Sequence, residues 1–272
     1  MIRIRKIGFK SASAVTVLAV LALGACGRGE NGWRHDPAAA ESQATPPQAG
    51  YLKPPSVVSA VRQEGGVALS GEAAPLASVR LGAPTGEALL GKADGAGRWR
   101  LVVPLAAEPR LYGLSMTLDG RTVQAQGYLM VTPNGRGVLL RAGGAAEVMA
   151  QASSSPRILA VDYDHSGGAV ISGVAAPGAG LGVRVDRTTR GEGKADDAGR
   201  FTISLSQALE AGARTIQVAG EGGEQQIVLE VSPPQPPTDG PVRSTLTTRG
   251  WRVDWMTPGG GVQTTQLLDA AQ

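Results

Sequence analysis

One block of sequence occurs twice in this chain of 272 residues, and the second copy follows the first by 102 positions. Each copy contains Ser-Gly-x-Ala-x-Pro and then Lys-Ala-Asp-x-x-Gly-Arg followed by an aromatic residue, at 70–75 and 92–99 in the first copy and at 172–177 and 194–201 in the second. Both motifs shift by the same distance, so the segment between them keeps its length. A repeat of this length has the size of a small domain, and it predicts two domains with one fold.

The second motif of each copy predicts a tight turn that leads into a strand. The Asp side chain can accept hydrogen bonds from the backbone of its own turn, and the Gly three residues later can adopt a positive φ. After the turn, Phe201, Ile203 and Leu205 alternate with polar residues, which is the pattern of a half-buried strand. We therefore expect the aromatic residue to anchor the core and the Arg before it to face solvent.

Short strand-like segments separated by Gly, Pro and Asp fill both copies, and segments with a helical period are almost absent. This pattern predicts an all-β protein with two tandem β-sandwich domains of two sheets each, at 56–142 and 157–232. An extra strand is expected at Gly137–Arg141. The Ala/Ser-rich segment 143–156 is expected to be a linker that allows independent motion, and its part 145–151 could form a short helix.

The N-terminal segment has the parts of a secretory signal peptide in the expected order. Residues 1–10 carry four basic side chains and no acid, and the apolar run Ala14–Leu23 is too short to cross a bilayer as a mature helix. Leu23, Gly24, Ala25 and Cys26 then follow.

This tetrapeptide resembles the lipobox of bacterial lipoproteins, in which the cysteine is lipidated and becomes the mature N-terminus. The resemblance implies a signal peptide at 1–25, a lipid on Cys26 and attachment to a membrane through that lipid; the alternative is an ordinary signal peptide with a chance cysteine. Gly27, where inner-membrane sorting would use Asp, implies the outer membrane facing the periplasm. Cys26 is the only cysteine, so no disulfide can form within the chain.

Cleavage before Cys26 changes the sign of the net charge. It removes four of the 26 basic residues and none of the 23 acidic ones, which leaves 22 against 23. The basic character of the whole chain therefore belongs to the signal peptide and gives no reason to expect binding to nucleic acid. The Pro/Gly/Ala-rich segment 26–55 is predicted to be a tether.

The C-terminal part begins with a Pro-rich spacer at 233–241 and continues with a predicted β-hairpin tail at 242–272. Trp251, Val253 and Trp255 would share one face of this hairpin. An isolated hairpin is marginally stable in water, so this face needs a covering surface. Docking onto one of the sandwiches, with the extra strand at 137–141 as a candidate surface, is the favoured interpretation, and an exposed aromatic binding face is the alternative.

Each copy resembles the bacterial Ig-like modules of proteobacterial envelope proteins, on the strength of Ser-Gly-x-Ala-x-Pro followed by Asp-x-x-Gly-Arg-aromatic. The resemblance implies that the two tandem domains are immunoglobulin-like (Ig-like) β-sandwiches and that they lie outside the cytoplasm, and it implies no catalysis. No segment resembles a peptidoglycan-binding LysM repeat. The first copy departs from the pattern because Leu76 stands where the second copy has Gly178.

Motifs that would carry chemistry are incomplete. Gly86–Lys92 lacks the hydroxyl residue and the helix of a phosphate-binding loop. Asp162 and Asp164 begin a Ca²⁺-loop pattern without its bidentate Glu, and are expected on one exposed strand face. His35 and His165 are the only histidines, so no zinc site or catalytic triad is expected. The sequence predicts no cofactor, no metal site and no catalytic residue.

Two hypotheses about function remain open from the sequence. The first is a non-catalytic, membrane-anchored envelope lipoprotein whose Ig-like modules act as a scaffold or bind an unknown envelope protein. The second is a module that binds carbohydrate or cell-wall glycan through Trp251 and Trp255.

Overall fold

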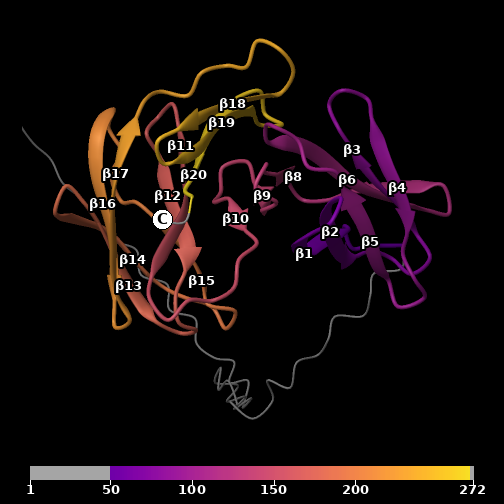
Figure 1. Cartoon of the computed structure of the whole chain (residues 1–272), viewed down its shortest axis with the longest axis horizontal. Coiled ribbons are helices and arrows are strands. Elements are labelled where there is room, and N and C mark those ends of the chain that lie inside the picture. Colours follow the sequence, from indigo (N-terminus) through magenta and orange to yellow (C-terminus); the bar gives the residue numbers. More distant parts are fainter. Residues whose placement is uncertain (1–49, 270–272) are drawn as a thin grey trace, which may run out of the picture. The chain divides into compact units, whose positions relative to one another are not determined.

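The computed structural model describes residues 50–269, which fold into twenty β-strands without a helix (Figure 1). The predicted all-β class is confirmed. The predicted signal peptide, the lipobox residues Leu23, Gly24, Ala25 and Cys26, and nearly all of the tether lie outside the described residues. Within residues 50–269, no helix is long and apolar enough to cross a membrane.

The first repeat forms two antiparallel sheets with an apolar core between them. One sheet has the strand order β1-β2-β5, and the other has the order β10-β9-β8-β6-β3-β4, with β7 paired to β6. Along the chain, β1 and β2 lie in the first sheet, β3 and β4 in the second, β5 in the first again, and the following strands in the second, as in Ig-like sandwiches. The strands are β1 (Ser56–Gln63), β2 (Gly66–Glu72), β3 (Ser78–Gly82), β4 (Ala88–Lys92), β5 (Arg98–Val103), β6 (Arg110–Leu118), β7 (Arg121–Gln124), β8 (Tyr128–Val131), β9 (Gly137–Leu140) and β10 (Glu147–Val148).

The second repeat has the same arrangement. Its two sheets contain β15-β12-β11 and β14-β13-β16-β17 in these orders, which correspond strand by strand to β5-β2-β1 and to β4-β3-β6 with a following strand. The sequence repeat is therefore matched by a repeat in the strand topology. The strands are β11 (Arg157–Asp164), β12 (Ala169–Val174), β13 (Gly180–Val185), β14 (Thr188–Lys194), β15 (Arg200–Ser204), β16 (Gly212–Gly220) and β17 (Gly223–Val231).

The aromatic residue of the repeated motif anchors each sandwich core, as predicted. Trp99 and Phe201 are 3 % and 2 % exposed and belong to the cores of the first and second sandwich. The preceding residues Arg98 and Arg200 point to the surface and pair with Asp94 and Asp196, respectively, across the turn.

The Gly of Ser-Gly-x-Ala-x-Pro is explained by the same aromatic residue. A Cβ at Gly71 would lie 1.9 Å from the Ser56 carbonyl oxygen and 2.6 Å from the Trp99 ring. At Gly173 the corresponding distances are 2.0 Å to the Arg157 carbonyl oxygen and 2.7 Å to the ring of the motif's aromatic residue. The two halves of the repeated block thus pack together, because the aromatic ring of one half lies against the glycine of the other.

The turn before the aromatic residue is held by its aspartate. Asp94 Oδ1 accepts hydrogen bonds from the backbone N–H groups of Ala96 and Arg98, both at 2.9 Å, and Gly97 has a φ of +80°. The bond from the Arg98 backbone is the main cause that lowers the pKa of the Asp94 carboxyl. The second repeat forms the same turn around Asp196.

A glycine of the second repeat adopts a left-handed backbone conformation without strain, whereas Leu76 adopts the same conformation with strain because it has a Cβ. Its φ is +62°, and Gly178 at the equivalent turn has a φ of +74°. Because Leu76 is 58 % exposed, Leu76→Gly should relieve this strain with little loss of packing and raise the free energy of unfolding by about 1 kcal/mol. Urea denaturation of both variants measures the effect, with Gly178→Leu expected to lower stability by a similar amount; a less stable Leu76→Gly protein would contradict the explanation.

The C-terminal tail forms three strands that extend a sheet of the second sandwich. The predicted hairpin is present as β19 (Gly250–Met256) and β20 (Val262–Leu267), and β18 (Val242–Thr247) adds a strand that was not predicted. Strand β20 pairs antiparallel with β11, which gives the sheet order β15-β12-β11-β20-β19-β18. The labels of these strands lie together in Figure 1.

A third apolar core joins the two repeats and the tail. Strands β6, β8 and β9 contribute residues from the first repeat, β11 and β12 contribute residues from the second, and β19 and β20 contribute residues from the tail. The buried members are Leu111, Met130, Val138, Leu140, Ala146, Val148, Leu159, Ala160, Val174, Val253, Trp255 and Leu267. The sandwiches therefore share a core, and the independent motion expected from the sequence does not agree with this packing.

The segment 143–156 is not the free linker that its composition suggests. Residues 147–148 form β10, which pairs with β9, and no helix forms at 145–151. Ala146 and Val148 are 1 % and 5 % exposed because both side chains enter the shared core. Small residues allow this segment to lie close to a sheet. A flexible linker is rich in the same small residues, so composition does not distinguish the two.

Candidate functional site

The two tryptophans predicted as binding residues lie on the tail strand β19 in different surroundings. Trp255 is fully buried in the shared core, and its indole Nε1–H donates to Thr265 Oγ1 at 3.2 Å. Tyr128 meets its ring edge to face, with centroids 6.1 Å apart. Trp251 is partly buried against the same core. The tail is thus docked, as favoured from the sequence, and its aromatic face shares a core with the β9 residues Val138 and Leu140.

A short segment crosses the outer face of the β11-β12-β15 sheet, and we call residues 143–148 the strap. Its first residues are held by Gln263 of strand β20. Gly143 N–H donates to Gln263 Oε1 at 2.9 Å, and Gln263 Nε2 donates to the Gly144 carbonyl at 2.9 Å. One side-chain amide therefore links the tail to the strap through both of its polar ends.

The centre of the strap is bonded to the second sandwich through two side chains. Ala146 N–H donates to Asp162 Oδ2 at 2.7 Å, and the Ser172 hydroxyl donates to the Ala146 carbonyl at 2.8 Å. Thr265 Oγ1 donates to the other carboxylate oxygen of Asp162 at 2.6 Å. Asp162 thus binds the strap and the tail at once. It lies under the strap at 2 % exposure, which corrects the expectation of a solvated carboxylate.

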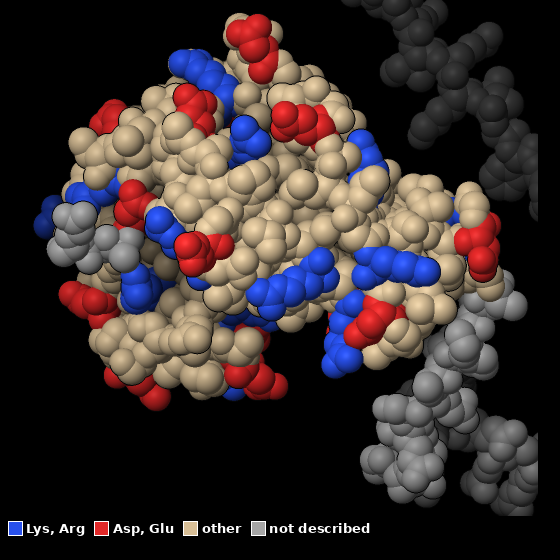
Figure 2. Space-filling model, turned by 45° about the vertical axis from the view of Figure 1, so that its right-hand side comes forward, with Lys and Arg blue, Asp and Glu red and all other residues tan. Residues whose placement is uncertain are grey.

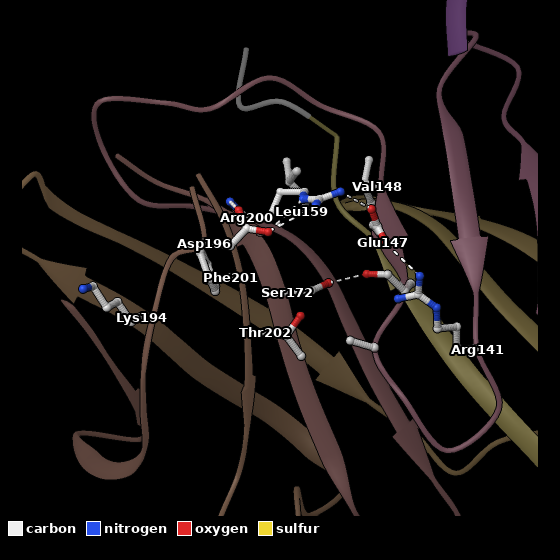
Figure 3. A pocket seen from close by; sticks show the side chains of 13 residues that line it. Arg141, Glu147, Val148, Leu159, Ser172, Lys194, Asp196, Arg200, Phe201 and Thr202 are labelled. Atoms are coloured by element: carbon white, nitrogen blue, oxygen red, sulfur yellow. Dashed lines mark hydrogen bonds and ion pairs between the residues drawn. The ribbon is translucent and has the colours of Figure 1, made fainter. Parts of the chain in front are cut away.

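An open cleft of about 410 Å³ lies beside the strap, between it and β12 and β15. Figure 3 shows Glu147 between two arginines in this cleft. Glu147 accepts from Arg141 at 2.9 Å and from Arg200, and Arg200 also pairs with Asp196 of the repeated turn at 3.1 Å. The repeated Asp-Arg pair therefore gains a partner from the strap only in the second repeat.

The polar groups of the cleft form a joint, in that they hold chain segments together. Its ion pairs are partly exposed, so each contributes less than about 1 kcal/mol. The Ser172 hydroxyl donates to a backbone carbonyl, as Figure 3 shows, and no base accepts its proton. The geometry fixes the direction of the strap and assembles no nucleophile–base pair at Ser172.

Burial is the main reason that the pKa of Asp162 rises to about 6, and hydrogen bonds from Thr265, Ala146 and Gln263 oppose the rise. The folded-state pKa is therefore above the unfolded value of about 4. Such a group stabilises the folded state fully below the unfolded pKa, and this stabilisation is lost as the pH rises through the folded pKa. Asp162 should make the joint more stable in mild acid than at neutral pH.

A comparison with Asp162→Asn isolates this contribution. As the pH falls from about 6 to about 4, the wild-type protein should gain about 2 kcal/mol of unfolding free energy relative to the variant. Urea denaturation of both proteins across this pH range measures the difference in unfolding free energy. The exposed aspartates, which have the opposite pH dependence, are present in both proteins and cancel in this difference. A difference that stays constant with pH would show that Asp162 does not titrate there.

A second polar cluster ties the tail to the end of β17. Arg252 pairs with Asp254 at 3.0 Å, and their side chains are 12 % and 5 % exposed. Arg252 also donates to Ser232 Oγ and, at 2.9 Å, to the Pro233 carbonyl. Its guanidinium lies 6.0 Å from the centroid of the Tyr163 ring. The start of the predicted spacer is therefore bound to the tail that follows it.

No metal centre is found within residues 50–269, where no three His, Cys, Asp or Glu side chains converge. Asp162 and Asp164 do not act together: Asp162 faces the strap, and Asp164 Oδ1 accepts from Ser166 N–H at 2.9 Å and from Gly168 N–H at 3.2 Å. His165 lies at this turn. On the face shown in Figure 2, basic and acidic side chains are interspersed over the surface.

No family model matches the sequence, and no curated protein matches it. Among solved structures, the chain is similar to a "Biofilm associated protein - BSP domain", with 13% identity over 66% of this chain and a TM-score of 0.22. It spans 30% of the length of that protein. It is also similar to a "Central Fibronectin-III array of RIM-binding protein", with 14% identity over 77% of this chain and 74% of the other, and a TM-score of 0.24.

Proposed function

We propose that the chain is a non-catalytic, membrane-anchored envelope lipoprotein whose two Ig-like sandwiches act together as one interaction scaffold. The observation that carries the proposal is the shared core between the repeats, with Trp255 at its centre. A chain of independent modules would need no such core. Strap, tail and both sandwiches instead hold one arrangement, which suits a protein that keeps a partner at a set place.

The membrane anchor rests on Cys26 and the lipobox residues before it. Metabolic labelling with a fatty-acid analogue should mark the wild-type chain and leave Cys26→Ser unmarked, and only the wild-type chain should enter the detergent phase on phase partitioning. Equal labelling of both chains would contradict lipidation at Cys26. Fractionation of the two membranes then tests the outer-membrane location.

The scaffold role predicts a stable partner in the envelope. Crosslinking in intact cells should trap one defined complex with the wild-type chain, and a variant with a disrupted shared core should lose it while its sandwiches stay folded. Absence of any defined complex would count against the scaffold. Glycan binding through the tail is not favoured, because Trp255 is fully buried and Trp251 packs on the same core.

A further inference from the structure

Strand β1 has a free side that its counterpart in the second repeat does not have. It is the end strand of the β1-β2-β5 sheet and pairs, among residues 50–269, with β2 alone. The counterpart β11 pairs with β12 on one side and with β20 on the other. The same edge of the same sheet therefore carries an added strand in one repeat and none in the other.

The two edges agree in their backbone geometry. Both strands have a register shift at the same place, at Val58 in β1 and at Leu159 in β11. In β11, pairing with β20 begins directly after this irregularity and runs from Ala160 to Asp164. The corresponding stretch of β1 is 59–63. The bulge, which often protects an edge strand, does not prevent strand addition at this position.

The side chains of the two edges differ in exposure. Val58 and Val61 are 64 % and 59 % exposed, whereas their counterparts Leu159 and Asp162 are 7 % and 2 % exposed. Val61 also continues a row across the sheet, since it pairs with Ala68, which pairs with the 41 % exposed Val102. Residues 56–61 carry no charge. Arg62 is the one charged residue of β1, and an edge strand with a single charge and exposed β-branched residues is suited to pairing with another chain.

We propose that β1 is a dimerisation edge and that its occupant is β1 of a second copy of this chain. Two identical strands that pair antiparallel are related by a two-fold axis, so each offers the other the same edge. The free stretch 59–63 lies between the bulge and the hairpin turn, and its midpoint is Val61. Full overlap therefore places Val61 opposite Val61 of the partner subunit, where β-branched cross-strand pairs are favourable.

The resulting sheet would have the order β5-β2-β1-β1-β2-β5, with six strands. The second repeat already builds a six-stranded sheet by adding three strands at the equivalent edge. The one charge near the axis, Arg62, donates to the Asn134 carbonyl of its own chain at 3.4 Å and would lie opposite Ala60 of the partner subunit. The inference goes beyond the proposed function and does not depend on lipidation of Cys26.

Sedimentation velocity on the chain from residue 27 onward tests the dimer, because this chain contains both sandwiches and no cysteine. The mass should double as the concentration rises. Val61→Lys places two ammonium groups opposite each other at the axis and should raise the dissociation constant at least about tenfold. Leu90→Lys, on the exposed strand β4 with Leu90 at 72 % exposure, is the matched control and should dimerise as the wild type does.

A disulfide test reports the register directly. Val61→Cys introduces the only thiol into this chain, and oxidation should crosslink it to a dimer at least about tenfold faster than Leu90→Cys at equal concentration. A monomer at all concentrations, an unchanged dimer in Val61→Lys, or equal crosslinking of the two cysteines would each overturn the proposal. Circular dichroism confirms that each variant is folded, so that a loss of dimer is assigned to the edge.

Discussion

Truncation of Trp255 to alanine is expected to lower the free energy of unfolding by about 3–5 kcal/mol, the range for large aromatic residues removed from a core. The ring is fully buried where both repeats and the tail meet, so the variant loses packing against three parts of the chain. It also leaves Thr265 Oγ1 without its indole donor.

Chemical denaturation measures this loss, and limited proteolysis shows where it acts. In Trp255→Ala, the tail should become the first segment to be cut, while the wild-type tail survives with the second sandwich. Leu246→Ala is the control on the same tail, since Leu246 is 63 % exposed and its removal should change stability by less than about 0.5 kcal/mol. A wild-type-like Trp255→Ala protein would mean that the tail does not depend on the shared core.

Gly173→Ala is expected to lower the free energy of unfolding by about 3 kcal/mol or more, because the added methyl group has no space. Its carbon would lie 2.0 Å from the Arg157 carbonyl oxygen and 2.7 Å from the Phe201 ring. Relief requires a shift of either the bulged strand β11 or the core aromatic residue. Gly71→Ala should have a similar effect in the first sandwich, for the same reason.

The control for this substitution is Gly182→Ala on strand β13. A Cβ at Gly182 meets nothing within 4 Å, and alanine reduces the conformational entropy of the unfolded chain, so this variant should be more stable by about 0.5 kcal/mol. Thermal unfolding of the four proteins separates the two kinds of glycine. Equal effects at Gly173 and Gly182 would show that the close approach of the aromatic ring is not what requires glycine.

The structure of the repeated block could be predicted from the sequence because the interactions that form it join residues close together in the chain. Asp94 and Gly97 form a turn with their own backbone, and Trp99 follows within two residues, so spacing alone predicts the turn, the strand and the core position. The docked tail followed from a similar argument, since two tryptophans on one strand face need a cover. The second sandwich then required no new information, because it repeats the first.

The strap and its partners could not be predicted, because their burial is decided by residues far away in the chain. Ala146 belongs to a segment with the composition of a linker. Hydrogen bonds with Asp162 and Ser172, which lie further along the chain, hold it against a sheet. Strand β20 shows the same effect: Gln263 and Thr265 are polar, yet they are buried as partners of this cluster. No periodicity within one segment reports such long-range hydrogen bonds.

The position of β20 has a consequence for the time at which this protein can finish folding. The strand is the last of the chain's described elements, yet it lies inside its sheet, between β11 and β19. The strands of the second sandwich are complete at residue 231, but the core residue Leu268 and the joint with the first repeat must wait for the end of the tail. Pairing partners so distant in sequence close slowly, so a nascent chain should pass through a stage in which the strands of both sandwiches are present and the shared core is still open. A chaperone or a protease would meet the protein at that stage.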